Sequence, residues 1–265
     1  MSEAQREILR RCTGFWTATE NALDCLICEQ LLWSFPLPKP ILSSLPEPFR
    51  SALLSMYAGD SQLGTDGEHH SIDPATGISP AEGMWLYDLC RKTKATETLE
   101  IGLAYGFSTL YFLAALAANN GGRHTSIDPH QRKVPGKWAG IGLAIGRRLG
   151  GKRFRFIEER SFAALIHLAD SSACFEIIFV DGRHFFDVVV TEFSMCVELC
   201  SMGGCIIFHD MWLPAIQRAV AFIRTNRTDF KYIETRLPNI AVFRRIGTDE
   251  RSFKHFVDFC NLDRQ

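Results

Sequence analysis

The amino-acid sequence predicts a doubly wound α/β fold built on a mostly parallel β-sheet. From residue 80 onward, segments with a helical spacing of apolar residues alternate with short strand-like segments. The strands at 175–180 and 204–208 are largely apolar, which is typical of central strands covered by helices on both faces. Two last strand segments, 230–235 and 240–244, have a short connection between them and are expected to close the sheet as an antiparallel hairpin.

The unit that recurs in this region is a strand followed by a helix. A helix at 80–93 comes first. The expected strands cover residues 97–101, 123–127, 154–157, 175–180, 204–208, 230–235 and 240–244. The expected helices between them cover residues 107–118, 137–148, 161–168, 186–200 and 214–224. Strands that alternate with helices imply a parallel sheet with helices on both of its faces.

The N-terminal part of the chain has a different character. Residues 1–58 look helical, with a proline-rich break at 35–40, and the pattern at 18–33 is apolar on most sides. Residues 59–80 are rich in Gly, Asp, Ser and His and predict a long loop. We therefore expect an N-terminal helical extension and loop at 1–77, a main domain at 78–247 and a C-terminal tail at 248–265.

Composition excludes several classes of protein. The 265 residues, 46% of them apolar, suffice for one large α/β domain with an added helical segment. The 29 basic and 30 acidic residues leave no basic footprint, so nucleic acid is not an expected partner. No long uncharged apolar run or secretory signal is visible, and the nine cysteines lack disulfide-framework spacing. These features predict a cytoplasmic protein without a membrane span.

The segment 98–110 is the most informative for function. It is an apolar strand, then a turn that contains Gly102 and Gly106, then a helix start with the hydroxyls of Ser108 and Thr109. Such a turn points backbone N–H groups and the positive helix end at a ligand with an anionic end. The glycine spacing, with Glu100 before the first glycine, differs from the dinucleotide fingerprint and argues against a nicotinamide oxidoreductase. The structural alternative is an ordinary strand–helix turn.

Polar residues follow the next two strands of the predicted sheet. Asp128 ends the strand at 123–127, where a carboxylate can accept hydrogen bonds from two ribose hydroxyls. An Asp-Pro turn is the alternative interpretation. Ser161 begins the helix at 161–168, and either caps this helix or hydrogen-bonds an adenine edge.

A second group of polar residues follows the two apolar strands. Asp181 ends the strand at 175–180 with His184 three residues later, and His209-Asp210 follows the strand at 204–208. If these strands are neighbours, the two carboxylates lie close together and repel each other unless a proton or a cation intervenes. Mg²⁺ prefers oxygen ligands, whereas His209 suits a softer metal. His184 has a near-neutral pKa and could accept a proton from a hydroxyl, or it could simply pack locally.

Together these segments resemble the class I S-adenosylmethionine-dependent methyltransferases. The run Glu100-Ile101-Gly102-x-x-x-Gly106-x-Ser108 is similar to the first motif of catechol- and caffeoyl-CoA-type O-methyltransferases. The runs that contain Asp181-Gly182-x-His184 and His209-Asp210 resemble a subgroup with macrolide sugar O-methyltransferases and cephalosporin-hydroxylase-like proteins. The resemblance covers about residues 78–245 and implies a seven-stranded sheet whose last strand is antiparallel.

The resemblance also implies roles for individual residues. The residues that it places around S-adenosylmethionine are Glu100, Gly102, Tyr105, Gly106, Ser108, Asp128, Ser161 and Asp181. Those that it places at a divalent metal such as Mg²⁺ are Asp181, His209 and Asp210, and its catalytic residues are His184 and Asp181. In the resembling family, the residue before the last Asp of this pattern is usually acidic, whereas this chain has His209 at that position. The expected function is methyl transfer to a hydroxyl of a small molecule, with the N-terminal segment as a cap or a homodimer interface.

Two other functions stay open at this point. A metal-independent N-methyltransferase that acts on an amine would use the same cofactor loop. A cofactor-binding but non-catalytic regulatory protein would combine an intact loop with an altered metal site.

Overall fold

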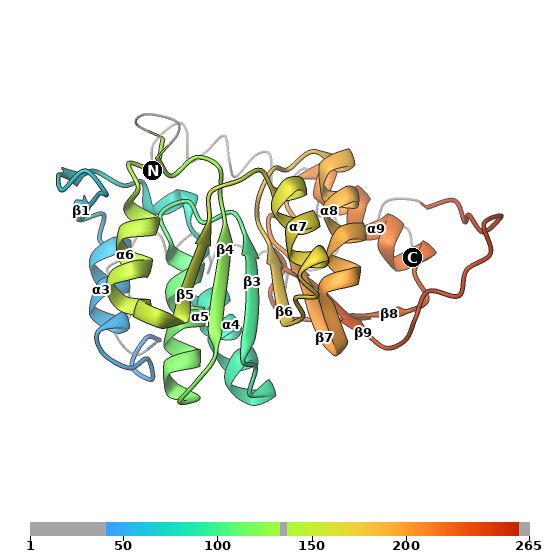
Figure 1. The fold of residues 1–265 in the computed structure, drawn as a ribbon, viewed down its shortest axis with the longest axis horizontal. Helices are drawn as coiled ribbons and strands as arrows, with labels where there is room; N and C mark the ends of the chain where they lie inside the picture. Colours follow the sequence, from blue (N-terminus) through green and yellow to red (C-terminus); the bar gives the residue numbers. More distant parts are fainter. Residues whose placement is uncertain (1–40, 133–136, 260–265) are drawn as a thin grey trace, which may run out of the picture.

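A computed structural model describes residues 41–132 and 137–259 of the chain. These residues form three layers, with one seven-stranded sheet between two layers of helices (Figure 1). The seven strands are β3 (Glu97–Ile101), β4 (Arg123–Ile127), β5 (Phe154–Ile157), β6 (Phe175–Val180), β7 (Cys200–Phe208), β8 (Phe230–Ile233) and β9 (Ala241–Arg245). The predicted α/β class and the mostly parallel sheet are confirmed.

The strand order is β5-β4-β3-β6-β7-β9-β8. Strands β3 to β7 pair in parallel, and β9 lies antiparallel between β7 and β8. The last strand is therefore antiparallel as expected, although β8 rather than β9 forms the edge. The chain winds from β3 toward β5 and then returns to add β6 on the other side of β3. This reversal creates a crevice at the carboxyl ends of β3 and β6, where open α/β sheets bind ligands.

Helices cover both faces of the sheet. The helices are α3 (Phe49–Tyr57), α4 (Pro80–Thr93), α5 (Phe107–Ala118), α6 (Ile141–Gly150), α7 (Ser161–Asp170), α8 (Phe186–Leu199) and α9 (Pro214–Asn226). Helices α3 to α6 share one buried apolar cluster with Ile177 and Phe179 of β6, whereas α7 to α9 share another with Ile178 and Val180. Neighbouring residues of β6 thus face opposite helix layers, which explains its continuous apolar run.

The described part of the N-terminal segment, from residue 41 onward, packs against the main domain. Leu42, Phe49 and Leu53 are buried in the same cluster as α4 and α5. The predicted loop contains a short hairpin of β1 (Gln62–Leu63) and β2 (His69–His70) and a 3-10 turn at Pro74–Thr76. The helix expected at 18–33 lies outside the described residues.

Element ends differ from the prediction where glycines redirect the backbone. Helix α6 begins at Ile141 rather than 137, because Gly140 precedes it with a φ of +69°. Strand β7 begins at Cys200 rather than 204, and its pairing with β6 contains a register shift close to Gly203, whose φ is +79°. In the described part of the chain, no helix combines the length and apolar character that crossing a membrane requires.

Candidate functional site

The sheet register aligns the predicted site residues in one row. Ile101 of β3 lies beside both Ile127 of β4 and Val180 of β6, and Val180 lies beside Phe208 of β7. The next residues, Gly102, Asp128, Asp181 and His209, therefore leave the sheet at the same level. Hydrogen bonds continue across them, because the Gly102 amide donates to Ile127 O and the Asp181 amide donates to Ile101 O, both at 2.9 Å. Residues 26 to 107 positions apart in sequence thus meet at the crevice.

The turn after β3 requires glycine for steric reasons. Gly102 has a φ of +101°, and a Cβ at this position would overlap with the carbonyl oxygen of Asp181 and lie 2.7 Å from its carbonyl carbon. Gly106 has a φ of +89° and is the N-cap of α5. Without a Cβ, each glycine lets its backbone touch the backbone of another segment. At Gly102 this segment is the strand end that bears Asp181, so the turn lies directly against it.

Glu100 lies beneath this turn, at the centre of a buried polar network. Its carboxylate accepts hydrogen bonds from the hydroxyls of Ser108 and Thr109 and, at 2.8 Å, from that of Ser126. His124 Nε2 lies 3.3 Å from the same carboxylate. Glu100 is 0% exposed, so this network anchors the start of α5 to β3 and β4. Direct contact of Glu100 and Ser108 with a cofactor stays a prediction.

Asp128 links the turn after β3 to the turn after β4. Its carboxylate accepts hydrogen bonds from the amides of Ala104 at 3.0 Å and His130 at 2.7 Å. The side chain of Gln131 donates hydrogen bonds to the Asp128 carboxylate at 3.2 Å and to Ala104 O at 2.7 Å. No sequence pattern indicated this role of Gln131. Ala104 has a φ of +45°, a conformation that these contacts hold in place.

Tyr105 lies on the outer side of the turn. Its ring packs edge-to-face on Trp138, with 5.0 Å between the ring centroids. Burial raises the pKa of Tyr105, and Asp73 of the 59–80 segment is the other group that affects it. Tyr105 therefore sits where this segment meets the cofactor turn.

Ser161 begins α7 as predicted, but it is not the N-cap of this helix. It is the first residue of α7, and the N-cap is Arg160, whose side chain makes no cap hydrogen bond. The alternative interpretation of Ser161 as the cap is therefore wrong by one residue. Its side chain instead hydrogen-bonds Glu192 of α8. Glu192 is 1% exposed, and its Oε2 has no hydrogen-bond partner among the described residues.

The buried Glu192 predicts an unusual pH dependence of stability. Burial raises the pKa of Glu192 to about 7, against an unfolded value of 4.5. Between these values the folded protein keeps a proton that the unfolded chain releases, so rising pH favours unfolding through this group. We expect Glu192→Gln to gain stability relative to the parent from pH 4.5 to 7, by up to about 3 kcal/mol.

Chemical denaturation of both proteins across this pH range measures the difference. Glu198→Gln, which removes an exposed carboxylate from the same helix, is the matched control. A stability difference between Glu192→Gln and the parent that stays constant with pH would contradict the expectation.

Asp181, His184 and Asp210 form a compact cluster at the crevice. One potential ligand atom from each residue lies within 4.8 Å of the other two. His184 Nε2 lies 3.4 Å from Asp181 Oδ1 and 3.3 Å from Asp210 Oδ2. All three side chains are partly exposed, and Asp210 has a φ of +59°, which is uncommon for a non-glycine residue. The cluster is thus accessible to a small molecule.

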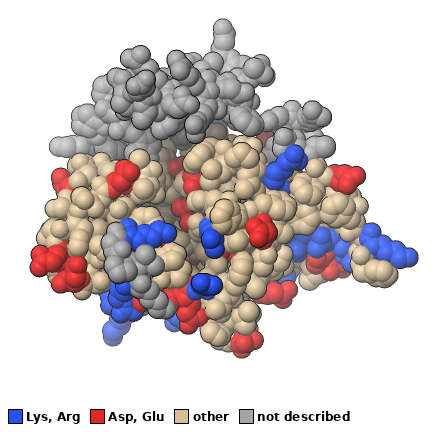
Figure 2. Space-filling view, turned by 90° about the horizontal axis from the view of Figure 1, so that it is seen from above, with Lys and Arg blue, Asp and Glu red and all other residues tan. Residues whose placement is uncertain are grey.

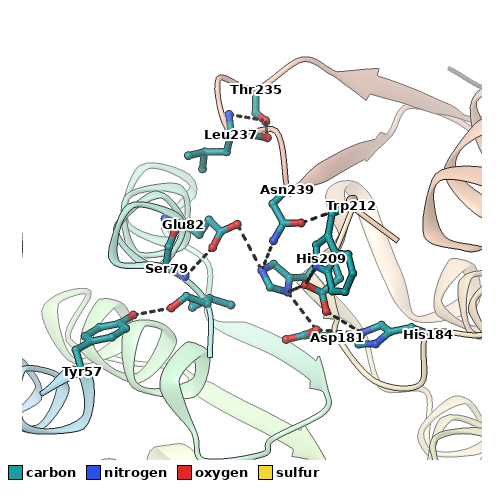
Figure 3. Close-up of polar contacts among 12 residues, drawn as sticks. Tyr57, Ser79, Glu82, Asp181, His184, His209, Trp212, Thr235, Leu237 and Asn239 are labelled. Atoms are coloured by element: carbon teal, nitrogen blue, oxygen red, sulfur yellow. Dashed lines mark hydrogen bonds and ion pairs between the residues drawn. The ribbon is translucent and has the colours of Figure 1, made fainter. Parts of the chain in front are cut away.

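His209 is buried and contacts the same carboxylate oxygen of Asp181 as His184 does (Figure 3). Its Nδ1 lies 3.3 Å from Asp181 Oδ1 and 3.3 Å from Asp210 Oδ1, and its Nε2 lies 3.4 Å from Glu82 Oε1. Asn239 Nδ2 lies 3.0 Å from the same Nε2. Both ring nitrogens therefore already have protein partners. The imidazole that completes the compact cluster is that of His184, whereas His209 was the expected metal ligand.

Electrostatic interactions among Asp181, His184 and His209 change the pKa values of all three side chains. Burial alone would lower the pKa of His209, but the charge of Asp181 and its hydrogen bond, with Glu82, raise it well above its usual value. Burial alone would raise the pKa of Asp181, but the charge of His209 and hydrogen bonds from both histidines hold it well below its usual range. The hydrogen bond to Asp181 likewise raises the pKa of His184. An ionised Asp181 thus stands between two basic imidazoles.

The rim of the crevice carries aromatic and polar groups. Trp212 is 64% exposed, yet its indole Nε1 donates a 2.9 Å hydrogen bond to Asp210 Oδ1. Acidic and basic side chains are interspersed over the face seen in Figure 2, without a field of one sign. Sequence patterns gave no signal for Gln131, Glu192 or Asn239, because each acts through contacts with distant segments. The Ser79-x-x-Glu82 spacing is a signal for a helix cap but not for the contact of Glu82 with His209.

Comparisons with known proteins show similarity to methyltransferases. Residues 99–211 match a family described as a methyltransferase domain. A relative from Mycobacterium sp. strain JLS, named "Putative O-methyltransferase", is 31% identical over 141 residues, which are 52% of this chain and 60% of that protein. A protein of the same name from Mycolicibacterium vanbaalenii is 30% identical over 146 residues, 52% of this chain and 58% of that protein. The chain thus spans about three fifths of the length of these relatives.

Solved structures show the same fold at low sequence identity. An S-adenosylhomocysteine-bound methyltransferase of Podospora anserina has a TM-score of 0.60 at 15% identity, over 87% of this chain and 98% of that one. An O-methyltransferase of Bacillus cereus in complex with S-adenosylhomocysteine has a TM-score of 0.56 at 18% identity, over 83% and 96% of the two chains. These similarities confirm the fold that the resemblance implied.

Proposed function

Because residues 99–211 match a methyltransferase domain family and the sheet has the fold of solved methyltransferases, we propose that this protein transfers a methyl group from S-adenosylmethionine to a hydroxyl of a small molecule. The observation that carries the proposal is the row of Gly102, Asp128, Asp181 and His209 at the crevice. A glycine turn for the cofactor and a cluster for proton transfer lie side by side there. The O-methyltransferase names of the relatives support a hydroxyl acceptor.

The cofactor would lie along the ends of β3 and β4. Gly102, Tyr105 and Gly106 would surround its methionine part, and the helix start at α5 would face its carboxylate. Asp128 would accept hydrogen bonds from the ribose hydroxyls, and Ser161 would lie near adenine. Glu100 and Ser108 would support this site from below through their buried network.

The reaction is a direct displacement at the methyl group, in which the acceptor oxygen attacks and the sulfur departs. Alignment of these two atoms supplies much of the rate. His184 is only partly buried, and its Nε2 faces the crevice beside two carboxylates, so it is the proposed proton acceptor. Asp181 would orient this imidazole and stabilise the charge that it gains.

The residues also fit a divalent cation in part. Asp181 and Asp210 supply the carboxylate oxygens that Mg²⁺ prefers, and His184 adds a nitrogen that suits a softer metal better. Such a cation would lower the pKa of an acceptor hydroxyl. With His184 as a ligand, the proton would pass to another acceptor, so metal dependence and His184 base catalysis are distinguishable.

The N-terminal segment borders the proposed cofactor site, which supports a capping role for it. Tyr57 of α3 packs on Phe107 at 4.8 Å between ring centroids and donates a hydrogen bond to Ile78 O. A Cβ on Gly77 would overlap with the Phe107 ring. Movement of residues 59–79 would therefore reach the first residue of α5.

Two measurements test the proposal. Calorimetric titration with S-adenosylmethionine should show micromolar binding, whereas NAD should not bind. Methyl transfer is then measured to an ortho-dihydroxybenzene, a sugar and a primary amine, with Mg²⁺ or with a chelator. Transfer to a hydroxyl supports the proposal, transfer only to the amine indicates an N-methyltransferase, and binding without transfer favours a regulatory protein. A parent protein that does not bind the cofactor overturns the proposal.

A further inference from the structure

Glu82 on α4 lies next to the catalytic cluster, although its sequence context indicates only a helix cap. It is the third residue of the helix and forms a capping box with Ser79. Its Oε2 accepts a 2.6 Å hydrogen bond from the Ser79 amide, and its own amide donates to Ser79 Oγ at 3.3 Å. This arrangement accounts for one carboxylate oxygen and for the start of the helix.

The second carboxylate oxygen is not needed for the cap. Glu82 Oε1 is buried, and no described residue offers it a hydrogen bond of good geometry. The nearest basic side chain is that of His209, whose Nε2 lies 3.4 Å away. Burial alone would raise the pKa of Glu82, but the hydrogen bond and charge of His209 hold it below its usual value. A buried carboxylate oxygen without another partner is costly unless this imidazole offsets it.

The His209 ring spans the distance between Glu82 and the cluster. Its other nitrogen, Nδ1, lies 3.3 Å from the carboxylates of both Asp181 and Asp210. Its ring lies near that of Phe179, with 5.8 Å between the ring centroids and an angle of 49° between the ring planes. Figure 3 shows Glu82 and Asp181 on opposite sides of this ring. The side chain of His209 is only 7% exposed, so water cannot readily replace either partner.

Resting on the function proposed above, we propose that Glu82 is a positioning residue, which orients the His209 ring and, through it, the carboxylates of Asp181 and Asp210. Asn239 Nδ2 also lies 3.0 Å from His209 Nε2, but it carries no negative charge. Without Glu82, the ring therefore loses the charged contact that opposes its pull toward the two aspartates. Because the same carboxylate caps α4, the start of this helix and the catalytic carboxylates are coupled through one side chain. The rival interpretation is that Glu82 serves the helix cap alone.

Two variants separate the cap from the contact with His209. Glu82→Gln keeps a side chain that can cap at this helix position but removes the negative charge that faces Nε2. Ser79→Ala removes the other half of the capping box and leaves the Glu82 carboxylate in place. The ring signals of His209 are recorded by NMR on the ¹⁵N-histidine-labelled full chain and assigned by their loss in His209→Gln. Thermal unfolding and calorimetry with S-adenosylmethionine accompany each variant.

We expect Glu82→Gln to shift both ring nitrogen signals of His209 while the unfolding temperature stays near that of the parent. Ser79→Ala should lower the unfolding temperature by a few degrees and leave the His209 signals in place. Unchanged His209 signals in Glu82→Gln, or equal shifts in both variants, would reduce Glu82 to a helix cap. Cofactor binding by the parent tests the proposed function separately, since the His209 signals report on Glu82 whether or not the cofactor binds.

Discussion

Replacement of Gly102 by alanine is expected to abolish S-adenosylmethionine binding and to lower the free energy of unfolding by at least about 3 kcal/mol. The new Cβ would overlap with the carbonyl oxygen of Asp181, and the backbone has a φ of +101° that alanine adopts poorly. Both obstacles are backbone features, so no side-chain rotation relieves them. The turn would have to separate from the end of β6, and we expect the affinity for the cofactor to fall more than about 100-fold.

Gly67 is the matched control for this substitution. Its φ of +87° imposes a similar backbone cost, but no atom lies within 4 Å of a Cβ at that position. Gly67→Ala should therefore lose only about 1–2 kcal/mol and keep cofactor binding. Calorimetry and chemical denaturation of both variants measure these quantities. Equal losses in the two variants would mean that backbone conformation, rather than the contact with Asp181, determines the requirement for glycine.

Replacement of Asp181 by asparagine is expected to slow methyl transfer by about 10²- to 10⁴-fold while cofactor affinity changes much less. The substitution keeps the size of the side chain but removes the charge that lies 3.4 Å from His184 Nε2 and 3.3 Å from His209 Nδ1. Without the negative charge of Asp181, His184 loses the group that orients its ring and favours its protonated form. Cofactor contacts of the β3 and β4 turns do not require this charge.

The rate is measured with whichever hydroxyl acceptor the parent uses, and affinity by calorimetry. Asp187→Asn removes an exposed carboxylate at the start of α8 and should leave both values near those of the parent. An Asp181→Asn variant that retains the parent rate would exclude Asp181 and His184 as the catalytic pair, while leaving the cofactor site unaffected.

Local patterns predicted most of the fold, because the periodic spacing of apolar residues that distinguishes strands from helices involves residues close together in the chain. The alternation of apolar segments correctly placed β3, β4, β5, β6 and α4 at their observed bounds. Errors occurred where a glycine redirected the backbone, as before α6 and within β7. The helix bounds around Ser161 were predicted well, yet its cap role was not, because one residue decides which side chain faces the helix end.

The sequence by itself therefore determined the α/β class, the glycine turn and the polar residues at the strand ends, since each depends on residues close together in the chain. Only the tertiary structure decided which of these polar groups meet. It placed both His184 and the buried His209 beside the partly exposed carboxylates of Asp181 and Asp210, and it placed Glu82 against His209, 127 positions away in sequence. The physical reason is that a buried charged group must pair with a side chain that the packing of distant elements places beside it. No pattern of neighbouring residues in the sequence specifies the distance between two such side chains.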